Sequence, residues 1–527
     1  MRVLDAIRKV AADQPVLTAV TRDGMEVSYA RFWRDIVGAA SDLAMLLPEA
    51  QVPVGIAMQD GYAQFVALLA VQSLGYAPVL FDGLVGQGEA RRGTDSVHAA
   101  QQLRQFRLER LRHRAKAGAI GWVVTDVRGE PSAFSMPDCQ CVKWELWPDV
   151  IAKGPLSADV AQIDPLARLR ALAPDAPIHV DMAFGRDAMP RFIARTRQQF
   201  EHWIDGFARV VPKTRRARYL VVGDALHGER FARVMSAWAR ADQVIFERRV
   251  SLPEAVALHH PEEFSLTAPE LQRLVNLMPA HVTLRNAPQI QVLGGGLSVR
   301  LQRQAVKRLG GECISSLMSP ESGAFAHAFG MAPGDQWCDR FRLVDWVRAQ
   351  VVDSAGEVLA DKQTGALRLE VECMAQSCWG PQGRRSVAQE GWFHTGDRGA
   401  LLPGRVLQLA ARAADEIDFD GVPVNCRHLE EALLQISGVV EAAVFAAAAG
   451  QAGEQLHVVV VPLPTLRGAV QRAVERWITE HLACVRQPRL LVVGAIPRTG
   501  SGAVVRGELL ALEAASARRT TSSEGVD

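Results

Sequence analysis

Two short apolar runs flank a helical segment between residues 53 and 82, and this order constrains the fold more than any other part of the chain. Residues 53–58 (PVGIAM) and 78–82 (PVLFD) have the length and composition of buried strands, and residues 61–77 have those of a helix. A strand, a helix and a second strand in succession are typical of a parallel sheet. We therefore predict an α/β fold.

The same alternation continues through most of the chain. Residues 218–224 and 288–296 are strand-like, and a helical segment follows each of them. Residues 340–410 are richer in strands, and residues 415–512 form a further α/β unit. At about 100–200 residues per domain, a chain of 527 residues folds into two to four domains.

From this pattern we predict a large N-terminal domain over residues 1–410, with two α/β subdomains and a small β-rich subdomain. A mobile C-terminal α/β domain is expected over residues 411–513, followed by a small, polar and disordered tail over residues 514–527. Residues 104–118 predict a basic amphipathic helix. Its arginines could touch phosphates, but a solvated helix face explains them better.

Charge and composition exclude several classes of protein. The chain has 59 basic and 58 acidic side chains, a net charge of +1, which argues against a nucleic-acid-binding protein. No stretch is apolar enough to predict a membrane span, and the first residues lack the apolar run of a secretion signal. Eight cysteines without metal-ligand spacing predict neither a disulfide scaffold nor a zinc site. We expect a cytoplasmic protein.

Three stretches carry the functional signal, namely residues 292–325, 391–445 and 496–509. Each short motif alone is usually a turn or a flexible loop, but their order and spacing together resemble the acyl-adenylate-forming superfamily. That superfamily contains acyl- and aryl-CoA synthetases, adenylation domains of nonribosomal peptide synthesis and luciferases. The matching residues of the second stretch are Gly391, Trp392, Thr395, Gly396, Asp397, Arg412, Asp415, Ile417, Gly421, Val424 and Glu430.

The resemblance implies the adenylate-forming fold and a reaction in two steps. A small carboxylic acid and ATP first give an acyl-adenylate, and the acyl group then passes to the thiol of CoA or of a phosphopantetheine arm on an acyl-carrier protein. It also implies AMP or ATP and Mg²⁺ as ligands. Such chemistry depends mainly on positioning and on electrostatic stabilisation of a phosphoryl centre.

The resemblance also implies a nucleotide-binding site with a role for each matching residue. Asp397 would accept hydrogen bonds from the ribose hydroxyls, Arg412 would assist at the ribose and phosphates, and Glu321 would hold Mg²⁺, which prefers carboxylate oxygen. Residues without a Cβ let the backbone lie flat against adenine. These are Gly294, Gly295 and Gly296.

The phosphate-binding parts depart from the family pattern. The Gly/Ser/Thr-rich loop aligns with residues 183–191, where Gly185 is kept and Arg191 replaces lysine, but no hydroxyl remains and Asp187 adds a negative charge. Ala503 stands where the family has its catalytic lysine, and no lysine follows Lys362. These losses predict weak ATP binding and impaired adenylation.

Three interpretations stay open. The chain is an AMP-forming acid–thiol ligase or acyltransferase with impaired adenylation, which adenylates slowly or only transfers an activated acyl group. Alternatively, it is a catalytically inactive pseudo-ligase that binds an acyl group, a nucleotide or another protein. A weaker third interpretation places different chemistry on the same fold, with His259, His260, Cys139 and Cys141 as the nucleophile or base candidates. Core or surface histidines are the better account of that pair.

Overall fold

The structure of the chain is a computed structural model. It describes residues 2–48, 52–58, 60–81, 116, 118, 120–126, 140–144, 166–184, 190–210, 216–222, 228–247, 249–279, 281–293, 297–329, 339–372, 374–380, 383–410, 416–419, 422–448, 454–482, 485, 488–498, 504, 507, 509 and 510. Among these residues, no helix is both long enough and apolar enough to cross a membrane.

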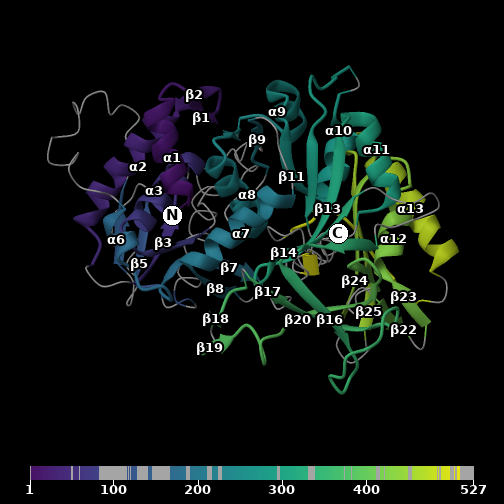
Figure 1. Cartoon of the computed structure of the whole chain (residues 1–527). Helices are drawn as coiled ribbons and strands as arrows, with labels where there is room; N and C mark the ends of the chain where they lie inside the picture. The colour runs from purple at the N-terminus through teal and green to yellow at the C-terminus, as the bar shows by residue number, and fades with distance from the viewer. Residues whose placement is uncertain are drawn as a thin grey trace, which may run out of the picture.

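Among the described residues, a sheet of 13 strands is the largest sheet of the fold (Figure 1). Its strands β1, β10, β9, β11, β12 and β13 pair in parallel in that spatial order, and antiparallel pairs extend both sides. In spatial order the strands are β16 (Val347–Val352), β17 (Gly365–Val371), β20 (Phe393–Leu402), β21 (Val406–Leu409), β15 (Arg340–Leu343), β14 (Gly323–Phe329), β13 (Glu312–Ser319), β12 (Gln289–Leu293), β11 (Glu263–Thr267), β9 (Arg218–Leu220), β10 (Gln243–Phe246), β1 (Thr18–Arg22) and β2 (Met25–Ser28).

A second sheet of eight strands contains the β-α-β unit predicted from the sequence. Its strands β7, β4, β3, β5 and β6 pair in parallel, and β8, β18 and β19 extend it in antiparallel pairs. In spatial order the strands are β19 (Gly383–Ser386), β18 (Ser377–Gly380), β8 (Pro190–Thr196), β7 (Pro177–Phe184), β4 (Ala77–Leu80), β3 (Pro53–Ala57), β5 (Trp122–Thr125) and β6 (Gln140–Lys143).

Helices cover and separate the two sheets. Helix α7 (Arg197–Val210) contacts β7 and β8 of the smaller sheet and β14 of the larger one, and α8 (Gly228–Ala239) likewise contacts strands of both. The remaining helices of this part are α1 (Arg2–Asp13), α2 (Tyr29–Ala44), α3 (Gly61–Ser73), α6 (Ala167–Arg170), α9 (Leu252–His259), α10 (Ala268–Leu277) and α11 (Val299–Leu309).

The helix starts follow ordinary capping chemistry. The side chains of Ser28 and Asp60 accept backbone hydrogen bonds at the N-termini of α2 and α3. Thr267 and Glu270 form a capping box at α10, where each side chain satisfies a backbone donor of the first turn. These three helix starts therefore have a local physical cause.

A buried polar chain crosses five neighbouring strands of the larger sheet. The Tyr219 hydroxyl on β9 donates to Ser265 Oγ on β11 (3.2 Å), which donates to Gln291 Oε1 on β12 (3.2 Å). Gln291 Nε2 donates to Ser316 Oγ on β13 (3.2 Å), and Ser316 Oγ lies 2.7 Å from His327 Nδ1 on β14. Burial and the charge of nearby Arg233 lower the pKa of His327 to about 3, so its ring is neutral.

The C-terminal part has its own apolar core. Strands β24 (Val439–Ala448), β25 (Glu454–Pro462) and β26 (Arg489–Val492) form a three-stranded sheet. Helices α12 (Cys426–Leu433) and α13 (Arg467–His481) pack with it around buried Val and Leu side chains. A short helix, η4 (Pro464–Leu466), precedes α13, and β22 (Glu416–Phe419) pairs with β23 (Val422–Asn425). Figure 1 places these elements at the opposite end of the molecule from α2 and α3.

Charged contacts join this part to the larger sheet and its helices. Arg273 Nη1 on α10 lies 3.2 Å from Glu441 Oε1 on β24. Within the C-terminal part, Arg498 Nε lies 3.7 Å from the other oxygen of the same carboxylate, Glu441 Oε2. Arg300 on α11 pairs with Glu431 on α12. Burial raises the pKa of Glu441, although both arginines oppose this shift.

The structure confirms the α/β class and the predicted elements around residues 53–80, 218–239 and 289–309. The strands predicted as a β-rich subdomain are present, and they continue the larger sheet by hydrogen bonding to it through β15. The domain limits at residues 410 and 513 stay predictions, because residues 411–415 and 511–527 lie outside the described residues. Most of the predicted basic helix over residues 104–118 lies outside them as well.

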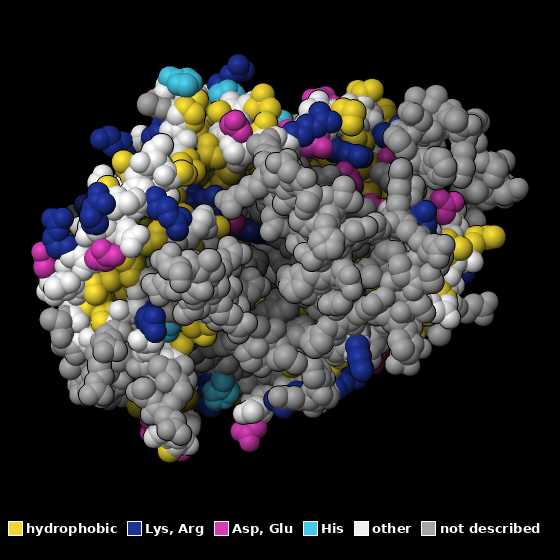
Figure 2. Space-filling model, turned by 180° about the vertical axis from the view of Figure 1, so that it is seen from behind, with side chains coloured by type: hydrophobic (Ala, Val, Ile, Leu, Met, Phe, Trp, Pro, Cys, Tyr) yellow, Lys and Arg dark blue, Asp and Glu magenta, His cyan; other side chains and the backbone are white. Residues whose placement is uncertain are grey.

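Surface charge agrees with the balanced composition. Figure 2 shows one face of the molecule, on which Lys and Arg side chains are scattered among acidic and apolar ones in the part that is described.

Candidate nucleotide site

Three of the predicted site residues lie in the described part of the chain, namely Arg191, Glu321 and Asp397. The other predicted nucleotide-binding residues, and the position of the predicted lysine replacement, lie outside the described residues. They are Gly185, Gly294, Gly295, Gly296, Arg412 and Ala503. The site is therefore built here from the three described residues and their neighbours.

Arg191 and Glu321 meet although they belong to different sheets. Arg191 lies near the start of β8, and Glu321 lies in the turn between β13 and β14. Arg191 Nη1 is 3.5 Å from Glu321 Oε1. The arginine side chain is 48% exposed, whereas that of the glutamate is 8% exposed. The pair thus places a solvent-accessible cation over a carboxylate fixed in the protein.

The turn that carries Glu321 is held by its own hydrogen bonds. Ser319 Oγ accepts from the backbone N–H of Ser322 (3.0 Å), and the two hydroxyls lie 2.9 Å apart. Gly323 follows at φ +67°, a left-handed conformation that glycine adopts without a Cβ clash. The carbonyl of Glu321 accepts from the backbone N–H of Ala375 (3.1 Å). These contacts fix the backbone on both sides of the carboxylate.

A bulge in β20 sets the direction of Asp397. Ala366 of β17 pairs with Arg398, and Arg368 pairs with His394, so β20 has extra residues between its two pairing positions. Extra residues in one strand re-aim side chains away from the regular alternation. Asp397 lies in this bulge and is 6% exposed.

The T-G-D residues of the bulge explain its shape. Gly396 adopts φ +76°, which favours glycine over any residue with a Cβ. The Thr395 hydroxyl donates to the Leu367 carbonyl (3.3 Å) and accepts from the backbone N–H of Asp397 (3.0 Å). The threonine and glycine of the motif are therefore required by the local backbone.

A buried charged cluster beside the Glu321 turn was missed by the sequence analysis. Arg195 on β8 is fully buried, and its guanidinium carbon lies 4.2 Å from the centroid of the Trp203 ring. Burial raises the pKa of the Glu229 carboxyl to about 8, while neighbouring Arg195 opposes the shift. The Asp181 carboxylate accepts a hydrogen bond from the backbone N–H of Gly228 at the start of α8 (3.3 Å).

One sequence signal could have found this cluster. Phe192 and Ile193 lie on opposite faces of β8, and both are fully buried. A strand that is apolar on both faces buries every side chain near its middle, so an arginine within it must find partners inside the protein. Arg195, two residues after Ile193 on the same face, meets that condition.

The described residues fit one protein ligand for Mg²⁺. No group of three or more His, Cys, Asp or Glu side chains in the described residues could hold a metal ion alone. Mg²⁺ in nucleotide sites is commonly bound through one or two carboxylates together with substrate phosphates. The buried Glu321 carboxylate matches that requirement, with Arg191 as a competing cation beside it.

The other candidates have structural contacts. His259 Nε2 lies 3.2 Å from Glu247 Oε2, and His260 ends α9 in the left-handed conformation at φ +41°. His260 Nδ1 accepts from the backbone N–H of Arg285 (3.4 Å). These contacts support the account of both histidines as structural residues. Cys139 lies outside the described residues, and Cys141 lies on β6.

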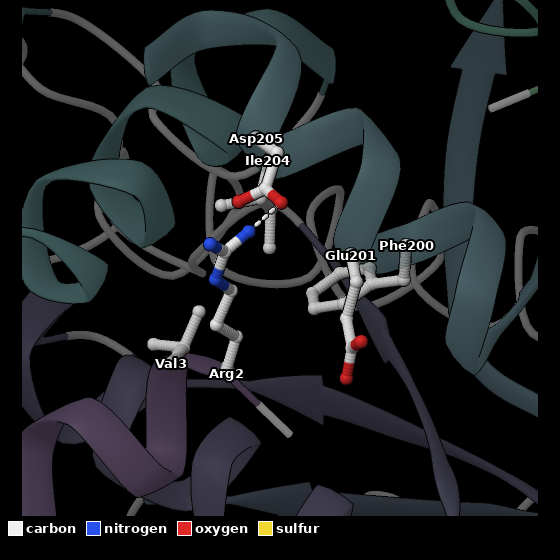
Figure 3. Close-up of a pocket in the computed structure, with 6 residues that line it drawn as sticks. All are labelled: Arg2, Val3, Phe200, Glu201, Ile204 and Asp205. Carbon is white, nitrogen blue, oxygen red and sulfur yellow. Dashed lines mark ion pairs between the residues drawn. The ribbon is translucent and has the colours of Figure 1, made fainter. Parts of the chain in front are cut away.

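A shallow pocket between α1 and α7 does not add a ligand site. Figure 3 shows the Arg2–Asp205 ion pair across it, with Val3, Phe200, Glu201 and Ile204 in its walls. Its space is about 10 Å³, which is room for one water molecule at most.

Comparison with known proteins gives a family match in the C-terminal part. Residues 428–503 match the C-terminal domain of AMP-binding enzymes. The match ends at Ala503, which the sequence resemblance predicts to replace the family lysine. Its range covers α12, β24, β25 and α13.

Several curated proteins are similar in sequence. A fatty acid–[acyl-carrier-protein] ligase of Streptomyces coeruleorubidus is 30% identical over 165 residues, which are 31% of this chain and 32% of that protein. A p-hydroxybenzoic acid–AMP ligase of Mycobacterium tuberculosis is 31% identical over 171 residues, covering 32% and 24%. A salicylyl-CoA synthase / salicylate adenylyltransferase of a Streptomyces species is 25% identical over 393 residues, covering 66% and 67%. The chain thus spans about a third or less of the first two relatives.

Solved structures share the fold over nearly the whole chain. The o-succinylbenzoate CoA synthetase of Bacillus subtilis, in complex with ATP and magnesium ion, matches with a TM-score of 0.69 at 18% identity. That match covers 96% of this chain and 98% of the other. ATP-bound MatB from Rhodopseudomonas palustris matches with a TM-score of 0.70 at 15% identity, covering 96% and 98%. The fold is the adenylate-forming fold, with a large N-terminal and a smaller C-terminal domain.

Proposed function

We propose that the chain is a member of the acyl-adenylate-forming superfamily, and that it activates or transfers an acyl or aryl acid to the thiol of CoA or of a carrier protein. The observation that carries this proposal is the contact between Arg191 and Glu321. The resemblance assigns the first to the phosphate loop and the second to the metal, and the two side chains approach each other from separate sheets.

The proposed chemistry uses the described residues as binding and orienting groups. Asp397 would accept hydrogen bonds from the ribose hydroxyls, and Arg191 would contact phosphate oxygens. Glu321 would hold Mg²⁺, which would supply positive charge to the phosphates. The curated relatives support the substrate class, since their names describe activation of fatty, hydroxybenzoic and salicylic acids.

Two bond exchanges make up the proposed reaction. In the first, a carboxylate oxygen attacks the α-phosphorus of ATP, pyrophosphate leaves, and an acyl-adenylate forms. In the second, the thiol sulfur attacks the acyl carbon, AMP leaves, and the thiol proton passes to solvent. We propose that the first step is impaired in this chain, because Ala503 supplies no cation and residues 183–191 contain no hydroxyl.

The test separates the two steps. Exchange of labelled pyrophosphate into ATP reports adenylation, and thioester formation from a supplied benzoyl- or octanoyl-adenylate with CoA reports transfer. We expect transfer without measurable exchange. Brisk exchange across a panel of aryl and fatty acids would contradict impaired adenylation and leave an ordinary ligase.

Ala503 also favours a second candidate function, a pseudo-ligase that binds an acyl group, a nucleotide or another protein without turnover. The same assay distinguishes it. Neither exchange nor transfer, with CoA and with a phosphopantetheine carrier as acceptors, would support the pseudo-ligase if calorimetry still detects AMP binding.

A further inference from the structure

One face of β8 contacts the Glu321 turn at two positions, Arg191 and Arg195, with Ile193 between them. Side chains two residues apart lie on the same face of a strand, so Arg191, Ile193 and Arg195 form a row. Arg191 pairs with the Glu321 carboxylate, and Ile193 packs in one apolar cluster with Ala375.

Arg195 completes the row at the backbone of the turn. Its Nη2 donates to the carbonyl of Pro320, the residue immediately before Glu321. Two consecutive carbonyls therefore accept hydrogen bonds at this turn. The Pro320 carbonyl accepts from Arg195, and the Glu321 carbonyl accepts from the backbone N–H of Ala375. The Glu321 side chain leaves a backbone that is held at two consecutive carbonyls.

The guanidinium of Arg195 is itself held in place. It is fully buried and stacks over Trp203 of α7, with 4.2 Å between the guanidinium carbon and the ring centroid. In the described residues, its Nε and Nη1 have no hydrogen-bond partner. Burying a guanidinium with so few hydrogen bonds costs free energy. Among the described residues, its hydrogen bond goes to the Pro320 carbonyl, in addition to its contact with the Trp203 ring.

The neighbourhood of Arg195 links the turn to helix α8. Glu229, in the first turn of α8, lies close enough to Arg195 to interact with its charge, and Asp181 binds the backbone N–H of Gly228. Strand β8, the start of α8 and the Glu321 turn thus meet around one buried guanidinium. The position of the carboxylate depends on this junction between the two sheets.

We propose that Arg195 is a positioning residue, which holds the Glu321 carboxylate where a metal-bound triphosphate is recognised. The proposal rests on the proposed function for its ligand, but the backbone contact can be tested without any ligand. The proposal predicts that replacing Arg195 affects the binding of one kind of ligand and not of another. Loss of the side chain weakens binding that depends on Glu321 and spares binding that depends on Asp397.

The first experiment measures hydrogen–deuterium exchange in the unliganded protein, with Arg195→Met and Arg195→Lys. We expect Arg195→Met to raise exchange of the Ser322 and Ala375 amides by about tenfold or more, because local protection follows the free energy of local opening. Arg195→Lys keeps a donor for the Pro320 carbonyl and should recover part of the protection. Unchanged exchange in Arg195→Met would overturn the proposal.

Arg308→Met is the matched control. Arg308 also donates to backbone carbonyls, those of Met278 (3.0 Å) and Val282 (3.2 Å), but it lies at the end of α11. We expect it to leave exchange at Ser322 and Ala375 unchanged. If Arg308→Met raises exchange there equally, the effect is general loosening and the proposal is wrong.

The second experiment compares calorimetric affinities for MgATP and for AMP without metal. We expect Arg195→Met to weaken MgATP binding by about tenfold and AMP binding by less than about twofold, the pattern of an interaction made with one ligand only. Equal weakening of both ligands overturns the positioning role. If Arg195→Met does not fold, the affinities of Arg195→Lys test the proposal instead. We then expect a smaller loss of MgATP affinity, again with little change in AMP affinity.

The two experiments also separate this inference from the proposed function. A wild-type protein that binds neither MgATP nor AMP would overturn the proposed function. The exchange measurement would still decide whether Arg195 holds the Glu321 turn, because it needs no nucleotide.

Discussion

Arg191 Nη1 lies 3.5 Å from Glu321 Oε1, across the boundary between the two sheets of the fold. The two side chains differ in freedom, since the arginine is about half exposed and the glutamate is nearly buried. A partly exposed ion pair contributes little to stability, about 0–1 kcal/mol. We therefore expect this pair to matter for ligand binding, in which Arg191 would contact a phosphate and Glu321 would hold a metal ion.

Replacing Arg191 by Met should weaken MgATP binding by about tenfold and change the melting temperature little, because exposed ion pairs stabilise weakly while charge-assisted contacts to phosphate are stronger. Arg191→Lys should recover most of the affinity. Calorimetric titration with MgATP measures the first effect and differential scanning calorimetry the second. An unchanged affinity would remove Arg191 from the phosphate site.

Replacing Asp397 by Ala should abolish measurable AMP binding. Hydrogen bonds to a charged acceptor contribute about 1.5–3 kcal/mol, which is a loss of about 10- to 150-fold. We also expect the wild-type protein to bind AMP more tightly than ATP, since the loop over residues 183–191 offers no hydroxyl to the added phosphates. Asp397→Asn is the control that keeps the shape of the side chain. Tighter binding of MgATP than of AMP would contradict this view of the site.

Restoring the family lysine alone should not restore adenylation. We expect Ala503→Lys to leave pyrophosphate exchange about 10³-fold below that of an ordinary relative, because the triphosphate still lacks its cradle. Combining Ala503→Lys with a Ser/Thr/Gly-rich loop at residues 183–191 should raise the rate more than the two changes do separately. Full rescue by Ala503→Lys alone would show that the loop matters less than proposed.

Stability should fall between about pH 5 and pH 8 through Glu229. Burial raises its folded-state pKa to about 8, above the ordinary value of 4.5. The folded state therefore binds the proton more tightly than the unfolded state, and its contribution is fully present below pH 4.5 and lost as pH rises through about 8. The free energy of unfolding should fall by at most about 1.4 kcal/mol per pH unit in this window.

Glu229→Gln removes that titration. Urea unfolding at pH 5 and pH 8.5 should give a smaller difference for Glu229→Gln than for the wild-type protein. Glu475→Gln, on the exposed face of α13, is a control that should keep the wild-type difference. Equal differences for Glu229→Gln and the wild type would show that Glu229 does not titrate in this range.

The C-terminal part should separate from the larger part when its charged contacts are removed. We expect Arg273→Ala combined with Arg300→Ala to increase the radius of gyration measured by X-ray scattering, since these side chains pair with Glu441 and Glu431 across the joint. High salt should enlarge the wild-type protein in the same direction by screening the pairs. Arg348→Ala, which removes an exposed pair with Glu370 within the larger sheet, should have no effect.

Local patterns predicted the elements well because their causes are local. Helix α3 begins after the capping side chain of Asp60, and the apolar composition of residues 53–80 already requires burial. Glu321 and Asp397 stay predicted site residues, and the motifs that predict them contain glycines and hydroxyls that shape the backbone around them. These signals lie within a few residues of the positions they predict.

Arg195 escaped prediction for the opposite reason. Its partners, Trp203 and Pro320, come from a helix and a hairpin that the chain brings together only on folding. The continuity of β15 with the parallel strands was likewise not readable, since strand pairing between distant segments leaves no periodic trace in either segment. Both features depend on contacts between distant segments that form only in the folded protein.

The polar chain from Tyr219 to His327 also limits how this protein can misfold. Its members occupy one position on each of five adjoining strands, so the hydrogen bonds form only when all five strands are correctly aligned. A strand that slipped by one residue would turn its polar member to the opposite face and leave buried donors and acceptors unmatched. This row of hydrogen bonds therefore favours the correct alignment of five strands at the centre of a wide sheet, where pairing between distant segments forms slowly.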